Sequence, residues 1–209
     1  MIKKIMPKYG YIPVISVFVF NLIVYYGTKL INGNMTHYDL AIGLDSMIPT
    51  LSPFVVIYAL AYIQWIFGYI MIARDSKQLC YYYITSELIA KFICGICFIL
   101  VPTVMVRPDI MGTDIFSKGL SIVYSMDTPT NLFPSIHILE SYLIARAGFQ
   151  MEKVGKGYRV GMVILSTLIA LSVLFTKQHL LVDIIGGILV AELGLFIYRK
   201  MKGLWTRKR

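Results

Sequence analysis

Two histidines and one aspartate have the residue types of a nucleophile that is oriented by a carboxylate. His179 and Asp183 are four residues apart in the segment KQHLLVD, and His137 lies earlier, in FPSIH. In a helix a spacing of four is about one turn, so Asp183 can accept the imidazole N–H and stabilise the charged ring. A carboxylate orients a catalytic histidine in this way. The pair therefore predicts a catalytic imidazole at position 179.

Further residues predict an anion-binding place beside these histidines. His137 follows Ser135 at the expected start of a helix, where free backbone N–H groups and the positive end of the dipole favour an anion. A histidine in that first turn can donate a proton to a leaving oxygen. Arg107 ends another apolar segment, and a guanidinium suits bidentate contact with phosphate oxygens. With Lys177, these groups are expected to converge at one depth of the molecule.

Apolar helices must position these residues, because the chain is 57% hydrophobic and only 15% charged. Soluble domains are about 45–50% apolar and about 25% charged, so lipid is the expected solvent. A helix needs about 20 apolar residues to cross a bilayer. The sequence predicts an all-α polytopic membrane protein, a six-transmembrane-helix bundle that forms one domain over residues 1–209. The expected spans are about 11–31, 53–73, 86–106, 134–149, 160–176 and 180–198.

The net charge of +9 is explained by the expected topology. Fifteen of the 20 Lys and Arg residues fall on the side of the two termini, four fall on the opposite side, and Lys91 lies within a span. Cytoplasmic loops of membrane proteins collect such cations. We therefore expect a multi-pass protein of the cell membrane with both termini cytoplasmic and the site near the outer face. No nucleic-acid partner is needed to account for the charge.

Other ionisable residues predict structural features. Thr113 and Asp114, either of which could cap a helix, stand before apolar residues at helical spacing, which predicts a short helix on the membrane surface. Glu87 and Lys91 are four apart within the third expected span, and this spacing predicts an ion pair. Glu140 follows His137 by about one turn. Its carboxyl group is expected either to tune that histidine or to bond to a neighbouring helix.

The order RP, PSxH and HxxxD on three successive helix ends resembles the type 2 phosphatidic acid phosphatase superfamily of membrane lipid phosphatases. The resemblance runs from about Arg107 to Gly187, and PSIH and KQHLLVD are its specific parts. It implies a six-span hydrolase that removes phosphate from a lipid phosphate or pyrophosphate. The family works without a metal or an organic cofactor. Its partner would be a membrane lipid with a phosphate headgroup.

The resemblance also implies a role for each residue of the predicted site. His179 would take the phosphoryl group as a phosphohistidine, and Asp183 would orient it. His137 would protonate the leaving lipid oxygen and then help water to attack. Arg107 and Ser135 would bind phosphate oxygens.

Two positions depart from the pattern of this family. The family's first motif has a lysine where this chain has Leu100, and its third motif has an arginine where this chain has Val173. Lys177 could supply one of the missing charges. A phosphate diester carries one negative charge and tolerates fewer cationic contacts than a monoester dianion. The losses therefore keep open a phosphotransferase that moves a phospho-headgroup between lipids, of the sphingomyelin or inositol phosphorylceramide synthase type.

Two other classes of function remain open from the sequence. His137, His179 and Asp183 could form a two-histidine, one-carboxylate metal site. Alternatively, the chain could be a non-catalytic scaffold or transporter, for which substitution of His179 by alanine would leave function intact. The enzymatic hypothesis differs from the scaffold because it requires the two imidazoles to approach each other.

Overall fold

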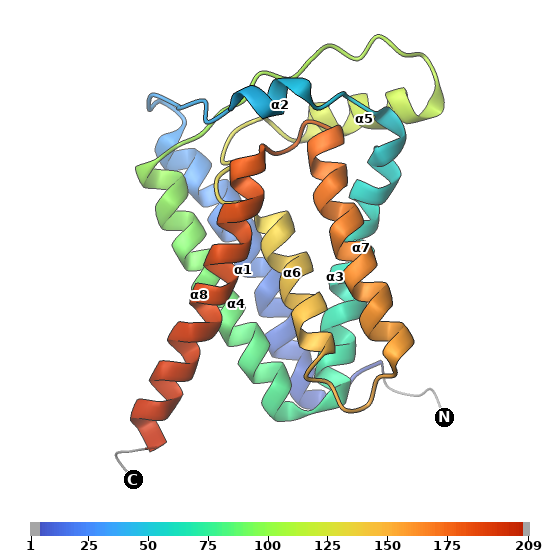
Figure 1. Cartoon of the computed structure of the whole chain (residues 1–209). Coiled ribbons are helices and arrows are strands. Elements are labelled where there is room, and N and C mark those ends of the chain that lie inside the picture. The colour runs from blue at the N-terminus through green and yellow to red at the C-terminus, as the bar shows by residue number, and fades with distance from the viewer. Residues whose placement is uncertain (1–4, 207–209) are drawn as a thin grey trace.

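The computed structural model describes residues 5–206, and that part of the chain is helical with no strand (Figure 1). Five of its helices are long and apolar enough to cross a membrane. They are α1 (Tyr11–Asn32), α3 (Val55–Asp75), α4 (Lys77–Leu100), α7 (Lys156–Phe175) and α8 (Leu181–Thr206). The prediction of an all-α membrane bundle is confirmed.

The fourth expected span is a short internal helix, α6 (Ile136–Gly148). Its 13 residues rise about 20 Å, which is less than the ~30 Å hydrocarbon layer. Figure 1 shows α6 in the middle of the bundle, and it contacts α3, α4, α7 and α8. The count of six spans is therefore not confirmed. In the described part of the chain, five candidate spans surround the shorter helix α6, which is almost entirely buried.

The third expected span, 86–106, is displaced toward the N-terminus. Helix α4 begins at Lys77, where the Ser76 hydroxyl accepts a hydrogen bond from Leu79 N at 3.1 Å. It ends at Leu100, before Pro102, which has no N–H to continue a helix. The chain beyond is extended, and the Pro102 carbonyl accepts a bond from Tyr38 N at 2.8 Å. Residues 101–106 therefore belong to a loop.

Short helices cover one end of the bundle. They are α2 (Gly43–Met47), η2 (Ser52–Phe54) and α5 (Ile115–Met126), while η1 (Lys8–Gly10) precedes α1. The Asp114 carboxylate caps α5 by accepting bonds from the N–H groups of Phe116 (2.9 Å) and Ser117 (3.2 Å), so the predicted short helix is present. In Figure 1 both ends of the described chain lie at the opposite end of the bundle.

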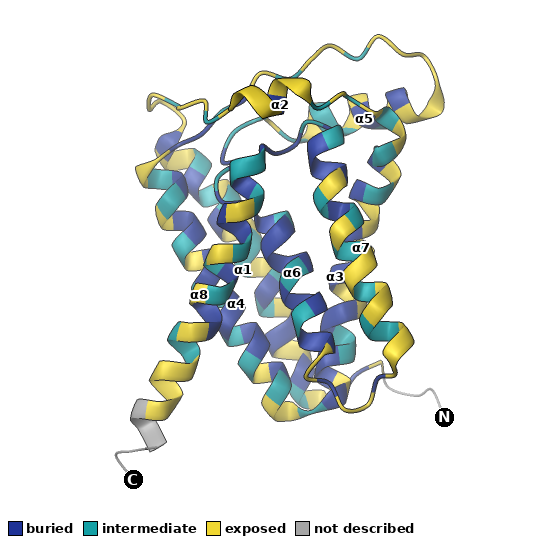
Figure 2. Cartoon of the chain, in the orientation of Figure 1, coloured by how far each residue is buried: buried dark blue, intermediate teal, exposed yellow. Residues whose placement is uncertain are grey.

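The long helices have exposed outer surfaces (Figure 2), and large hydrophobic side chains are found along them. Leu30 on α1 is 90% exposed, and Ile12 on the same helix is 81% exposed. Exposed side chains of this kind also run along α3 and α8. A contiguous apolar surface around a bundle has lipid as its natural solvent, so the chain is a multi-pass membrane protein.

Two glycines allow α8 to pack closely on its neighbours. A Cβ atom at Gly194 would collide with the Ser86 carbonyl of α4. A Cβ atom at Gly187 would lie 2.6 Å from the Ser135 carbonyl, just before α6. Small residues permit this approach between membrane helices. The start of α8 is thereby held against the start of α6, where the predicted site residues lie.

Candidate functional site

The histidine–aspartate pair forms where α7 turns into α8. His179 lies two residues before α8, and Asp183 lies in its first turn. The His179 Nδ1 atom is 3.3 Å from Asp183 Oδ2, which also accepts the Leu180 N–H at 2.8 Å. The Asp183 carboxylate is fully buried, whereas the His179 side chain retains 9% exposure. The carboxylate is thus fixed by the backbone and can hold one edge of the imidazole in place.

His137 reaches the same place from the first turn of α6. Its ring centroid lies 5.5 Å from that of His179, with 61° between the two planes. The ring also stacks on Tyr58 of α3, with centroids 4.9 Å apart. Its Nε2 atom is buried and has no hydrogen-bond partner among the described residues. The expected approach of the two imidazoles is present, and His137 holds a ring nitrogen available to a ligand.

Both imidazoles line a cavity of about 270 Å³. Aromatic side chains form much of its wall: they are Tyr25, Tyr26, Tyr62, Trp65 and Phe98. Polar groups of Asp127, Asn131 and Gln178 border it at the end covered by α5. No lysine or arginine is among its lining residues in the described part of the chain. The cavity can therefore accept a ligand whose small polar group lies near the polar residues and whose apolar part lies against the aromatic wall.

Comparison with family models, curated proteins and solved structures found no match. The family resemblance therefore depends on the motifs and on the geometry of the residues that carry them. Between residues 5 and 206, no group of three or more His, Cys, Asp and Glu side chains has the arrangement to hold a metal ion. The geometry gives no support to the two-histidine, one-carboxylate metal site.

Arg107 reaches the site from the loop after α4, not from the end of a span as expected. Its Nε donates to the Lys177 carbonyl (3.1 Å), its Nη1 to the Asp127 carbonyl (2.5 Å) and its Nη2 to Gln178 Oε1 (2.7 Å). The guanidinium also covers the Tyr124 ring at 4.6 Å. Burial lowers the pKa of Arg107 and the charge of Asp127 opposes this effect, but a guanidinium stays charged. Arg107 thus joins the two loops that flank His179.

Ser135 ties the two helix starts together. Its hydroxyl oxygen accepts the Ile138 N–H at 3.3 Å, so Ser135 is the N-cap of α6 and the helix begins two residues later than Pro134. Its own N–H donates to the Asp183 carbonyl at 3.1 Å. The residue is fully buried and does not line the cavity. In this structure Ser135 positions the site and does not face it.

Lys177 is not brought into the cavity. Its backbone has a positive φ of 50°, and its ammonium donates to the carbonyls of Asp45 (3.0 Å) and Ile48 (2.6 Å) under α2. Burial lowers the pKa of Lys177, whereas the nearby Asp45 carboxylate raises it. The side chain therefore stabilises the loop that covers the bundle. Neither Lys177 nor Arg107 is among the described residues that line the cavity.

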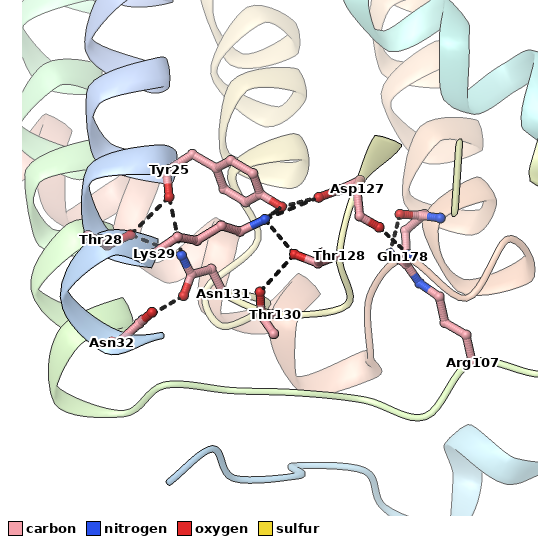
Figure 3. Close-up of polar contacts among 10 residues, drawn as sticks. All are labelled: Tyr25, Thr28, Lys29, Asn32, Arg107, Asp127, Thr128, Thr130, Asn131 and Gln178. Atoms are coloured by element: carbon pink, nitrogen blue, oxygen red, sulfur yellow. Dashed lines mark hydrogen bonds and ion pairs between the residues drawn. The ribbon is translucent and has the colours of Figure 1, made fainter. Parts of the chain in front are cut away.

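Lys29 of α1, to which the sequence analysis gave no role, does not line the cavity but contacts two residues of its wall, Tyr25 and Asp127. Figure 3 shows it beside Tyr25, Asp127 and Thr128. Its ammonium donates to Tyr25 Oη (2.5 Å) and Thr128 Oγ1 (2.7 Å) and lies 3.6 Å from Asp127 Oδ1. Tyr25 also donates a short hydrogen bond to Asp127. The spacing of Tyr25 and Lys29, four residues apart at a span end, was the signal that could have revealed this pair.

Asparagines anchor the loop that carries Asp127. Asn131 has a positive φ of 57°, and its amide donates to Thr28 Oγ1 at 2.9 Å. Asn32 in turn donates to Asn131 Oδ1 at 2.8 Å (Figure 3). It also donates to the Phe98 carbonyl at 2.7 Å. These buried bonds hold the loop between α1 and α4. They thereby hold Asp127, the partner of Lys29, in the wall of the cavity.

Proposed function

We propose that the chain is a membrane-embedded hydrolase that removes phosphate from a lipid phosphate or pyrophosphate through a phosphohistidine. The observation that carries the proposal is the meeting of His137 with the His179–Asp183 pair at one cavity. Two segments far apart in sequence supply these groups, the start of α6 and the start of α8. A non-catalytic scaffold has no need for two imidazoles and an orienting carboxylate at one place.

The chemistry follows from the hydrogen bonds of the rings. Asp183 accepts the proton on His179 Nδ1, which leaves the lone pair of Nε2 as the nucleophile. When Nε2 forms a bond to phosphorus, the bond between phosphorus and the lipid oxygen breaks. His137 gives its proton to that oxygen, and the lipid alcohol departs; with a pyrophosphate, the oxygen is the bridging one and the lipid monophosphate departs. Water then attacks the phosphohistidine, His137 takes the proton from water, and phosphate leaves with His179 restored.

One observation favours a second candidate, the phosphotransferase. The positions where the family has its lysine and one arginine carry Leu100, which is 71% exposed, and Val173, which packs between Tyr58 and Ile138. Neither residue carries a charge, and the cavity has no lysine or arginine among its described lining residues. A phosphodiester has one negative charge to neutralise and fits this wall better than a dianion. A second lipid alcohol would then replace water as the attacking group.

The test uses purified protein in nanodiscs with three labelled substrates: phosphatidic acid, a prenyl pyrophosphate and a phospholipid diester. Free phosphate and lipid-to-lipid transfer are followed with and without a lipid alcohol. We expect turnover of at least one substrate and its loss by a factor of about 10³–10⁴ in His179→Ala. An alkali-stable, acid-labile label on the protein is expected in the wild type and absent in this variant.

His37→Ala is the matched control, since this half-buried histidine lies outside the cavity and bonds locally, to the Met35 carbonyl. It should retain full turnover. His137→Ala should slow substrates with poor leaving groups more than those with good ones. Turnover in His179→Ala equal to that of the wild type would eliminate the phosphohistidine, and equal slowing of all leaving groups would eliminate the acid role of His137.

A further inference from the structure

A second and larger cavity lies at the opposite end of the bundle, where both ends of the described chain lie. Its volume is about 770 Å³, which is within the range of sites for small molecules. Its walls are the α3–α4 turn, the α6–α7 connection and the last turns of α8. Figure 1 shows that the C-terminal part of α8 extends away from the bundle there. None of the residues of the proposed active site borders this cavity.

The polar groups of the cavity form a fixed floor and a cationic side. Asp75 is buried, and its carboxylate accepts the N–H groups of Glu152 and Lys153, both at 2.9 Å. The Lys153 ammonium donates to the Arg74 carbonyl at 3.0 Å and to that of Asp75. The charge of Asp75 is thus satisfied by the backbone. The floor joins the α3–α4 turn to the α6–α7 connection and is rigid without a ligand.

The cationic side is provided by α8. Arg199 and Lys202 border the cavity from consecutive turns of this helix. Arg199 uses its Nε atom for a bond to the Leu195 carbonyl at 3.3 Å, and its two terminal nitrogens have no other bond among the described residues. Those two nitrogens carry four N–H donors, which suit the oxygens of a phosphate.

The surroundings of the cavity have the character of a membrane interface. Tyr82 of α4 and Tyr198 of α8 meet edge to face, with ring centroids 5.4 Å apart, on the cavity wall. Tyrosines gather at the level of lipid headgroups. Beside them, Phe196 and Met201 of α8 are 50% and 55% exposed. Acyl chains can lie along this apolar flank while a headgroup occupies the cavity.

From these contacts we infer that this cavity binds the phosphate headgroup of an anionic phospholipid of the adjacent leaflet. Basic pockets between membrane helices bind such headgroups. Three cationic side chains (Lys153, Arg199 and Lys202) and two acidic side chains (Asp75 and Glu152) border the cavity. The Asp75 carboxylate already accepts two backbone N–H groups. The bound lipid would join the C-terminal part of α8 to the α3–α4 turn. The inference does not depend on the proposed catalytic function.

The test compares thermal unfolding of the full chain in nanodiscs of phosphatidylcholine with and without about 30% phosphatidylglycerol. We expect a midpoint about 5 °C higher with the anionic lipid. Arg199→Gln/Lys202→Gln should lose most of this shift and bind the anionic lipid about tenfold more weakly. Lys77→Gln/Lys156→Gln, which removes two exposed charges at the same end but outside the cavity, should keep the shift.

Equal loss of the shift in both double variants would overturn the inference, because the effect would then be general surface attraction. Absence of any shift in the wild type would overturn it too. A midpoint raised by inorganic phosphate in pure phosphatidylcholine nanodiscs would mean that the cavity takes a soluble anion instead of a lipid. If the double variant does not fold, Arg199→Gln alone serves in the same comparison, with the same outcomes.

Discussion

A buried ion cluster in the middle of the bundle offers the sharpest test of how the helices are held together. Lys91 of α4 lies 2.9 Å from Glu87 Oε1 and closer still to Glu140 Oε1 of α6. Its ammonium also donates to the Val17 carbonyl of α1 at 3.2 Å. All three charged side chains have 0% exposure. One ammonium thus joins three helices, and the two carboxylates depend on it for their charge.

Replacement of Lys91 by methionine keeps the volume and removes the charge. At 2.9 Å a single ion pair amounts to about 6 kcal/mol at an effective dielectric constant of ~20. Protonation of the stranded carboxylates recovers part of this loss. Removal of one partner of a buried pair costs about 3–5 kcal/mol in measured cases, and here two carboxylates lose the same partner. We expect a fall of about 10 °C or more in the unfolding midpoint.

The assay is thermal unfolding in nanodiscs, with a neutral triple variant as the key comparison. Glu87→Gln/Lys91→Met/Glu140→Gln removes all three charges at similar volume, so it should recover most of the stability that Lys91→Met loses. Lys156→Met at the exposed start of α7 is the control and should stay within about 0.5 kcal/mol of the wild type. A triple variant no more stable than Lys91→Met would refute the reasoning, because the loss would then come from packing and not from unpaired charge.

Three further predictions concern the site and its cover. Asp183→Asn should lower turnover by about 10³–10⁴-fold without loss of the fold. Initial rates measure the turnover, the unfolding midpoint checks the fold, and a loss of turnover below tenfold would contradict the orienting role. Lys29→Met should raise KM for an anionic substrate by about tenfold with a smaller change in kcat, and an unchanged KM would restrict Lys29 to holding its loop. Hydrogen bonds from Ser117 lower the pKa of Asp114 in the folded state. The cap should therefore stabilise α5 fully above the unfolded-state pKa near 4, and this stabilisation should be lost as the pH falls through the lower pKa of the folded state. Hydrogen exchange of α5 amides between pH 6 and pH 3 checks this, and Asp114→Ala should exchange fast throughout.

The sequence determined the local features of this protein. Long apolar stretches form helices because lipid offers no partner for unpaired backbone groups. The His179–Asp183 contact, the Glu87–Lys91 pair and the cap of α5 each join residues within four positions. Such contacts follow from helix geometry alone, and for this reason spacing predicted them.

The tertiary structure alone decided which distant groups meet. His137 faces His179 because Gly187 lets α8 lie against the start of α6, and no spacing rule reports that approach. Of the two interpretations of Glu140, the bond to a neighbouring helix is present, since its carboxylate pairs with Lys91 of α4.

Loops decided where the cations went. Lys177 precedes His179 by two residues, yet its ammonium donates to two carbonyls near α2 and lies outside the cavity. Lys29 of α1 is far away in sequence, yet it contacts Asp127 in the cavity wall. Arg107 bonds to Gln178, the neighbour of His179, although α4 ends at Leu100, seven residues before Arg107. Long side chains bond to the nearest acceptors in space. The positions of those acceptors depend on packing between segments that are distant in sequence, and spacing along the chain does not reveal that packing.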